Sequence, residues 1–138
     1  MNRIKDKILR VAPEILSGYP VAFAYLYGSY AKECEHQFSD LDVCIYTEKI
    51  PCSEKLRVQM AVALEFDEKI GEGIDSEVRI MNDLTLIIKG QVVTEGLLIY
   101  SKDDDLRADV EVYIRKAYFD FLPVIHEYQQ AFIDSIVT

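Results

Sequence analysis

An uninterrupted apolar run from Val21 to Tyr27 constrains the fold of this chain more than any other segment. The run consists largely of aromatic and aliphatic side chains, and it therefore predicts a buried strand. It is far shorter than the roughly 20 residues that a membrane-spanning helix needs. A strand of this kind must be covered by other parts of the chain, so we expect a sheet with helices packed on it.

Hydrophobic periodicity divides the rest of the chain into helices and strands. We expect helices over residues 3–17, 51–70, 83–95 and 104–137, and further strands over residues 40–47, 74–81 and 97–101. In the last helix, apolar residues recur in steps of three and four from Leu106 to Ile136, and Pro123 predicts a kink or a break. The chain is therefore predicted to have an α/β (α+β) fold with a small mixed sheet of about four strands flanked by helices. Residues 1–138 are expected to form a single domain with a long C-terminal helix.

Apolar side chains form one face of each of the first two expected helices, and the last expected helix has more of them than the sheet can cover. The expected apolar positions are Ile4, Ile8, Leu9, Ala12 and Leu16 in the first helix, and Leu56, Met60, Ala63, Leu64 and Phe66 in the second. A small sheet cannot cover the whole of the last helix. We therefore expect Phe132, Ile133, Ile136 and Val137 to remain for contact with a partner.

The charge balance argues against one large class of partners. The chain carries 24 acidic and 15 basic side chains, a formal net charge of −9. A protein that binds nucleic acid by neutralising phosphates needs a field of the opposite sign, so we expect no direct nucleic-acid partner. The balance favours a basic partner or a site that gathers cations.

Localisation is predicted from the N-terminus and from the cysteines. The charged N-terminus leads into no apolar signal core, and no apolar run is long enough to cross a membrane. The three cysteines, Cys34, Cys44 and Cys52, show no metal-type pairing and are interpreted as reduced thiols. We expect a cytoplasmic protein without membrane association.

Two short motifs carry the chemistry of the chain. Gly28-Ser29 follows the buried strand, and Asp40-Leu41-Asp42 follows it after a spacer of ten residues. Glycine lets the backbone turn tightly beside a ligand, and serine offers a hydroxyl and an N–H to a phosphate oxygen. The two aspartates, two residues apart on a strand, project from one face roughly 6 to 7 Å apart. Such carboxylates suit Mg²⁺ held together with substrate phosphates, which indicates phosphoryl or nucleotidyl transfer.

These motifs resemble those of the MNT family of minimal nucleotidyltransferases, in the DNA-polymerase-β-like nucleotidyltransferase superfamily. The resemblance is carried by residues 28–32 (GSYAK), 39–43 (SDLDV), 118–123 (YFDFLP) and 126–128 (HEY). It implies the nucleotidyltransferase fold, with Mg²⁺ or Mn²⁺ bound by the motif aspartates and ATP as the nucleotide donor. The nucleotide-binding residues are then expected to be Gly28, Ser29 and Lys32, the last as a point charge on a phosphate.

In this family a third carboxylate normally completes the site from the next strand, as a metal ligand and as the base for the incoming hydroxyl. The strand predicted over residues 74–81 offers Asp75 and Glu77, which lie on one face because they are two residues apart. Glu77 fits better, since the family has an aspartate at the equivalent distance ahead of a Leu-Asn pair, here Met81-Asn82. We therefore expect the catalytic and metal-binding residues to be Asp40, Asp42 and Glu77.

The resemblance implies a protein adenylyltransferase. It would transfer AMP from ATP to a hydroxyl, that of a tyrosine, on a cognate HEPN ribonuclease toxin, and would form a complex with this toxin as its antitoxin. Two alternatives are open: a non-catalytic antitoxin that neutralises the toxin by binding, and a small-molecule nucleotidyltransferase. Enzymes of the second kind usually carry an additional substrate-binding domain, for which 138 residues leave no room.

Overall fold

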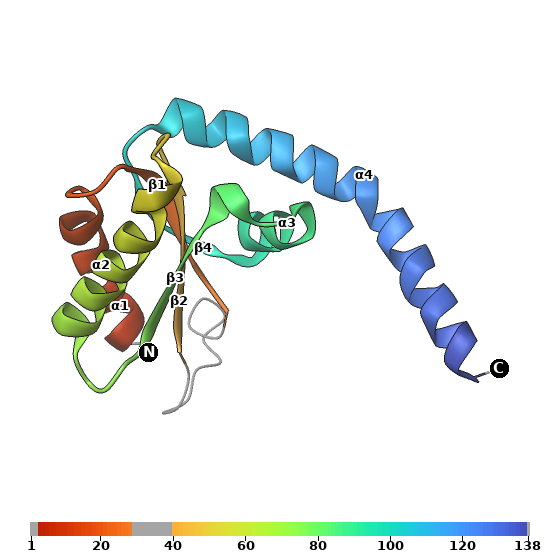
Figure 1. Cartoon of the computed structure of the whole chain (residues 1–138), viewed down its shortest axis with the longest axis horizontal. Helices are drawn as coiled ribbons and strands as arrows, with labels where there is room; N and C mark the ends of the chain where they lie inside the picture. The colour runs from red at the N-terminus through yellow and green to blue at the C-terminus, as the bar shows by residue number, and fades with distance from the viewer. Residues whose placement is uncertain (1–2, 29–39, 138) are drawn as a thin grey trace.

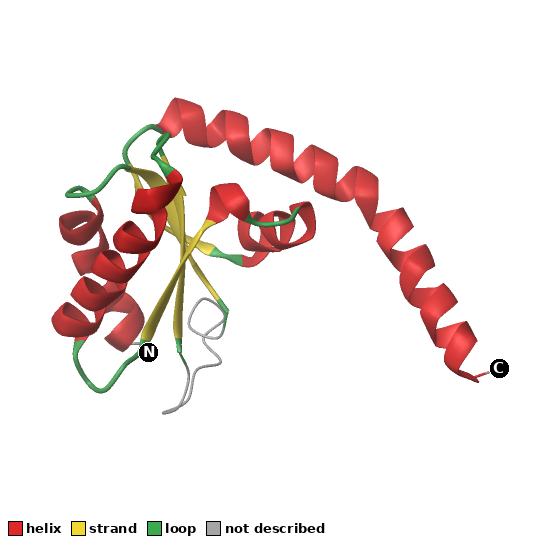
Figure 2. Ribbon diagram, in the orientation of Figure 1, coloured by secondary structure: helices red, strands yellow, loops and turns green. Residues whose placement is uncertain are grey.

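The computed structural model describes residues 3–28 and 40–137 of the chain. These residues form a sheet with helices on both faces (Figures 1 and 2). Along the chain the elements are α1 (Arg3–Leu16), β1 (Val21–Tyr27), β2 (Leu41–Thr47), α2 (Cys52–Ile70), β3 (Ser76–Ile80), the 3₁₀ turn η1 (Met81–Asp83), α3 (Leu86–Glu95), β4 (Leu97–Ser101) and α4 (Asp104–Val137). The predicted mixed α/β fold is thereby confirmed.

The four strands lie in the order β3-β2-β1-β4. β1 pairs antiparallel with both β2 and β4, whereas β2 and β3 are parallel and are joined through α2. The interior position of β1 explains its composition, because residues 21–26 are all buried. The apolar run therefore forms a central strand, as its sequence predicts.

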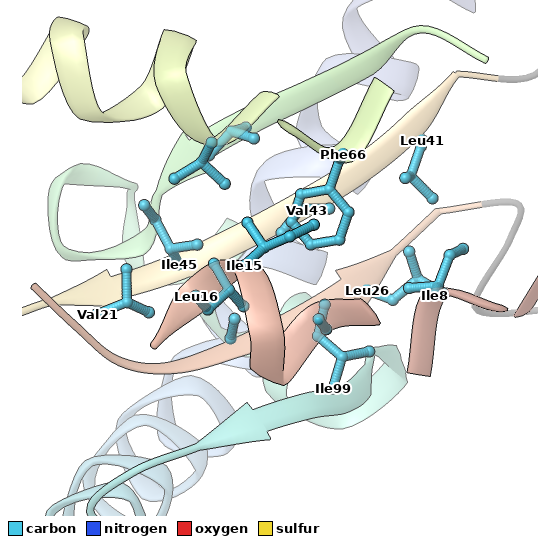
Figure 3. Close-up of a cluster of buried hydrophobic side chains, with 14 of the residues drawn as sticks. Ile8, Ile15, Leu16, Val21, Leu26, Leu41, Val43, Ile45, Phe66 and Ile99 are labelled. Carbon is cyan, nitrogen blue, oxygen red and sulfur yellow. The ribbon is translucent and has the colours of Figure 1, made fainter. Parts of the chain in front are cut away.

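Helices α1 and α2 cover one face of the sheet and enclose the larger core. Figure 3 shows side chains of these two helices against those of β1, β2 and β4, among them Ile8, Ile15, Leu16, Phe66, Val43 and Ile45. Alternate residues of β2 point to opposite faces. The side chains of Leu41, Val43 and Ile45 face this core, so Asp42 and the other residues between them face the side of α3 and α4.

The helix α4 packs on the domain through its first half and projects from the domain through its second half. Its first half packs against the second face of the sheet through the buried Ile114. The ring of Tyr118, a residue of α4, packs against Gly90 of α3. A Cβ added to Gly90 would be 2.1 Å from this ring. Beyond this contact the helix changes direction and projects from the domain (Figure 1). It continues without a break through Pro123 to Val137, so the break allowed for in the prediction does not occur.

Candidate active site

The two strands of the parallel pair bring two carboxylates together. In the register of β2 and β3, Asp42 is opposite Glu77 and Cys44 is opposite Arg79. On its other side Asp42 is opposite Tyr27, the last residue of β1. The carboxylates lie at the end of the sheet where β1 ends and β2 begins. The sequence predicts both residues as site residues, but their direct opposition follows only from the strand register.

The turn after β1 presses against the Asp42 carboxylate. Gly28 has a φ of 82°, in the left-handed region that favours glycine. A Cβ at this position would lie 2.7 Å from Asp42 Oδ2, so a side chain here would require the carboxylate or the turn to shift. Gly28 therefore allows both the turn and its close approach to the carboxylate. Ser29 and Lys32, the other expected nucleotide-binding residues, lie outside the described residues.

Burial and neighbouring charges raise the pKa of Asp42. The largest cause is desolvation, followed by the negative charge of Glu77, while Asp40 adds a smaller effect in the same direction. The positive charge of Arg79 acts in the opposite direction. The ionised Asp42 is thus held near two other carboxylates with partial compensation from one guanidinium. A bound cation would relieve this repulsion.

Arg79 is a site residue that the sequence analysis missed. Its Nε donates a hydrogen bond of 3.2 Å to Glu77 Oε1, and both side chains are about half exposed. Arg79 also lines a small cleft of about 70 Å³ together with Tyr27, Asp42, Val43, Cys44 and Ile88. The signal that could have identified it is its position two residues after Glu77, which places both side chains on one face of a strand.

The remaining expected carboxylates take different positions. Asp40 precedes β2 and is exposed, although its charge still acts on Asp42. Asp75 precedes β3 and is also exposed, and its main-chain carbonyl accepts a hydrogen bond of 2.9 Å from the N–H of Leu41. Glu77, not Asp75, is the residue opposite Asp42. The geometry therefore favours Glu77 over Asp75 as the partner of Asp42.

The donor set suits a divalent cation in its chemistry. Mg²⁺ is commonly bound by one or two carboxylates together with substrate phosphates and water. Asp42 and Glu77 supply such a pair. Among the residues described, no three acidic, histidine or cysteine side chains converge in an arrangement that could hold a metal ion on their own. Phosphate oxygens of a nucleotide, together with water, would complete the coordination of a cation held by this pair.

Asn82 holds the ends of the two carboxylate-bearing strands together. Its Oδ1 accepts a hydrogen bond of 2.9 Å from the N–H of Thr47, and its Nδ2 donates one of 3.1 Å to the Thr47 carbonyl. The amide thus pairs with the last residue of β2 as a neighbouring strand would. This contact supports the register that sets Asp42 opposite Glu77.

The thiol next to the site is not a nucleophile. Cys44 is buried and lies two residues after Asp42, on the same face of β2. The pKa of its thiol is raised to about 11, mainly by desolvation. Smaller effects contribute to the same value: Arg79 lowers the pKa of Cys44, whereas Asp42 and Glu77 raise it. A thiol with a raised pKa stays protonated at neutral pH, so the chemistry expected at this site rests with the carboxylates.

The family of the chain follows from a match over most of its length. Residues 12–105 match the family described as "Polymerase beta, Nucleotidyltransferase". The chain belongs to this nucleotidyltransferase family. The matched range includes Gly28, both motif aspartates and Glu77, and it ends at the beginning of α4. None of the curated proteins matches this sequence significantly.

Solved structures share the fold over nearly the whole chain. One, described as a toxin–antitoxin with AMP-PNP, is 18% identical with a TM-score of 0.65, and 97% of this chain covers 98% of that one. Another, described as a tri-AMPylated Shewanella oneidensis HEPN toxin in complex with an MNT antitoxin, is 16% identical with a TM-score of 0.63, with 97% and 99% covered. A third, from Shewanella oneidensis, is 15% identical with a TM-score of 0.62 over the full length of both chains. At these identities the likeness establishes the fold. Among the described helices, none has the length and apolar character to span a membrane.

Proposed function

We propose that this nucleotidyltransferase transfers AMP from ATP to a hydroxyl of a cognate HEPN toxin, a tyrosine hydroxyl by family resemblance, and so acts as its antitoxin. The observation that carries the proposal is the opposition of Asp42 and Glu77 beside the Gly28 turn, within a domain of the nucleotidyltransferase family. Structures with the same fold are described as a toxin–antitoxin with AMP-PNP and as an AMPylated HEPN toxin with its antitoxin, which supports both the nucleotide and the acceptor.

The proposed roles combine the positions of the described residues with what the family resemblance implies for Ser29 and Lys32. Asp42 and Glu77, together with Asp40, would hold Mg²⁺ or Mn²⁺, and Gly28, Ser29 and Lys32 would bind the triphosphate. When bound, such a cation would supply positive charge against the negative charge that develops on the phosphate oxygens. The acceptor oxygen forms a bond to the α-phosphorus, and the bond from that phosphorus to the bridging oxygen breaks, so that pyrophosphate leaves with the electron pair. The proton of the acceptor hydroxyl passes to the carboxylate of Glu77.

A second candidate function is an antitoxin that neutralises by binding alone. One observation favours it, because Glu77 is engaged by Arg79 and the described side chains do not form a three-ligand metal group. In either case we infer that residues 1–138 act as one domain. We also infer that it works in the cytoplasm, where ATP is available and where the free thiols of Cys44 and Cys52 stay reduced.

The intact mass of the cognate HEPN toxin tests the proposal. The toxin is co-expressed with the wild-type chain, with Asp42→Asn, or with Glu68→Gln, which changes an exposed acidic residue on α2 across the sheet. We expect a mass gain of one or more AMP units with the wild type and the Glu68 variant, and none with Asp42→Asn. A toxin that is unmodified but bound and inhibited would overturn catalysis in favour of neutralisation by binding.

A further inference from the structure

The second half of α4 extends away from the domain that carries the site. The family match ends at residue 105, and one anchor of α4 on the body is the contact of Tyr118 with Gly90. A helix of 34 residues is about 50 Å long, so a substantial part of α4 lies beyond this anchor. Figure 1 shows this part as a separate arm.

One face of the arm is apolar and exposed. Phe121, Ile125, Tyr128, Phe132 and Ile136 follow each other in steps of four, three, four and four, and therefore form a stripe along one side of the helix. In the first half of α4, Ile114 lies on the same stripe and is buried in the core. In the arm, Tyr128 is 78% exposed, Phe132 66% and Ile136 65%. An apolar surface of this extent on a single chain marks an interaction site.

An acidic edge runs along this stripe. Asp120, Glu127 and Asp134 are spaced by seven residues, or almost two turns, and so lie on one side of the helix beside the apolar face. The sequence has neither Lys nor Arg from Ala117 to Thr138. Two copies of the arm packed on each other would bring only acidic edges together. A surface with an apolar groove bordered by Lys or Arg complements both features of the arm.

We propose that the arm, residues 119–136 of α4, docks in an apolar groove of the cognate HEPN toxin whose border is basic. The binding mode is an amphipathic helix in a groove, with Tyr128, Phe132 and Ile136 as anchors. The identity of the partner rests on the proposed function. The solved toxin–antitoxin structures support it, because their likeness covers 97% of this chain and therefore includes α4. The arm recruits the toxin, while the carboxylates carry out the transfer.

The experiment measures the affinity of the full-length chain for purified toxin by calorimetry. The test variant is Phe132→Glu/Ile136→Glu, and the matched control is Leu56→Glu/Leu64→Glu, which changes two residues of α2 that are each 64% exposed. All four side chains are exposed, so the fold should persist, and circular dichroism verifies this. We expect the arm variant to bind at least about tenfold more weakly and the α2 variant to bind like the wild type. Glu127→Lys should also weaken binding, because it places a positive charge against the basic border.

Asp42→Asn separates this proposal from the proposed function. We expect it to bind the toxin with wild-type affinity while failing to modify it. Wild-type affinity of the arm variant would overturn the docking proposal and leave the transfer reaction standing. A homodimer of the wild type in sedimentation that is lost in the arm variant, with toxin binding unchanged, would assign the arm to a second copy instead. A wild-type chain that neither binds nor modifies the toxin would overturn both proposals.

Discussion

Asp42 and Glu77 are register partners on the parallel strands β2 and β3, and each carboxylate lies in the negative field of the other. A divalent cation between them would bind the folded state and not the unfolded chain. At a concentration a hundredfold above its dissociation constant, such a ligand stabilises the fold by about 2.7 kcal/mol. We therefore expect Mg²⁺ to raise the melting temperature of the wild type by several degrees, measured by thermal unfolding with and without the cation.

Three variants identify the carboxylates that respond to Mg²⁺. Asp42→Asn and Glu77→Gln should lose most of the shift, whereas Asp75→Asn should keep it, because Asp75 precedes β3 and is not opposite Asp42. An equal shift in wild type and Asp42→Asn would show that the cation does not bind there. Loss of the shift in Asp75→Asn but not in Glu77→Gln would exchange the roles of these two residues.

The raised pKa of Asp42 predicts a stabilising substitution in the absence of metal. Because the folded protein binds this proton more tightly than the unfolded chain, stability is lost as the pH rises from the ordinary value near 3.8 through the raised pKa. Above that window the ionised, half-buried carboxylate costs free energy. In EDTA at pH 7.5, we expect Asp42→Asn to be more stable to urea than the wild type, with a smaller difference at pH 4.5. An Asp42→Asn variant that is less stable at pH 7.5 would contradict this assignment.

Arg79 should compete with a cation for Glu77, since its guanidinium already occupies Oε1. We expect Arg79→Gln to bind Mn²⁺ several-fold more tightly than the wild type in the absence of nucleotide, measured by calorimetry or by electron paramagnetic resonance of the free ion. Arg79→Lys keeps the charge and should stay close to the wild type. Weaker Mn²⁺ binding in Arg79→Gln would show that Arg79 supports the site in another way.

The side-chain amide of Asn82 pairs with the main chain at the end of β2 as a neighbouring strand would, so removing it should lower the stability of the fold. Asn82→Ala leaves both the N–H and the carbonyl of the buried Thr47 without their partner in the amide. We expect a loss of about 1–3 kcal/mol in the free energy of unfolding, measured in urea. The control is Gln59→Ala, which removes one hydrogen bond to the Val78 carbonyl of β3 and should cost less. Equal costs would mean that the Asn82 amide has no special role in fixing the register.

The elements were largely predictable because each has a clear period or composition. The prediction for β4, residues 97–101, agrees with the structure, and that for the last helix does so over its whole length. The ends of other elements depend on contacts that periodicity does not contain. The expected strand over residues 74–81 is shorter, because Met81 already belongs to the 3₁₀ turn that places the Asn82 side chain on β2. The helix expected from residue 83 begins at Leu86, after its cap Thr85.

The face of a helix that is buried was harder to predict than the helix itself. The sequence places Leu9 on the apolar face of the first helix, but its side chain is 39% exposed. In α2 the apolar residues Leu56, Met60 and Leu64 are exposed, while the core receives Val58, Val62 and Phe66. When one helix carries two apolar stripes, the sequence alone does not show which of them is buried against the sheet. Arg79 was missed because its spacing from Glu77 shows only that the two side chains share a face, whereas their hydrogen bond is seen only in the structure.

Gly28 provides the sharpest test of the link between backbone and site. Gly28→Ala would strain a residue with a φ of 82° and place its Cβ against Asp42 Oδ2. Gly73 is a matched control, because its φ is 71° and a Cβ there would meet nothing within 4 Å. Gly73→Ala should lose about 1–2 kcal/mol of stability, roughly the cost of the left-handed conformation, and Gly28→Ala should lose at least as much because its Cβ also meets Asp42. Only Gly28→Ala should also displace the Asp42 carboxylate, and we expect it alone to lose the Mg²⁺-dependent rise in melting temperature. A Gly28→Ala variant that keeps the full rise would show that the turn can retreat from Asp42 without disturbing the site.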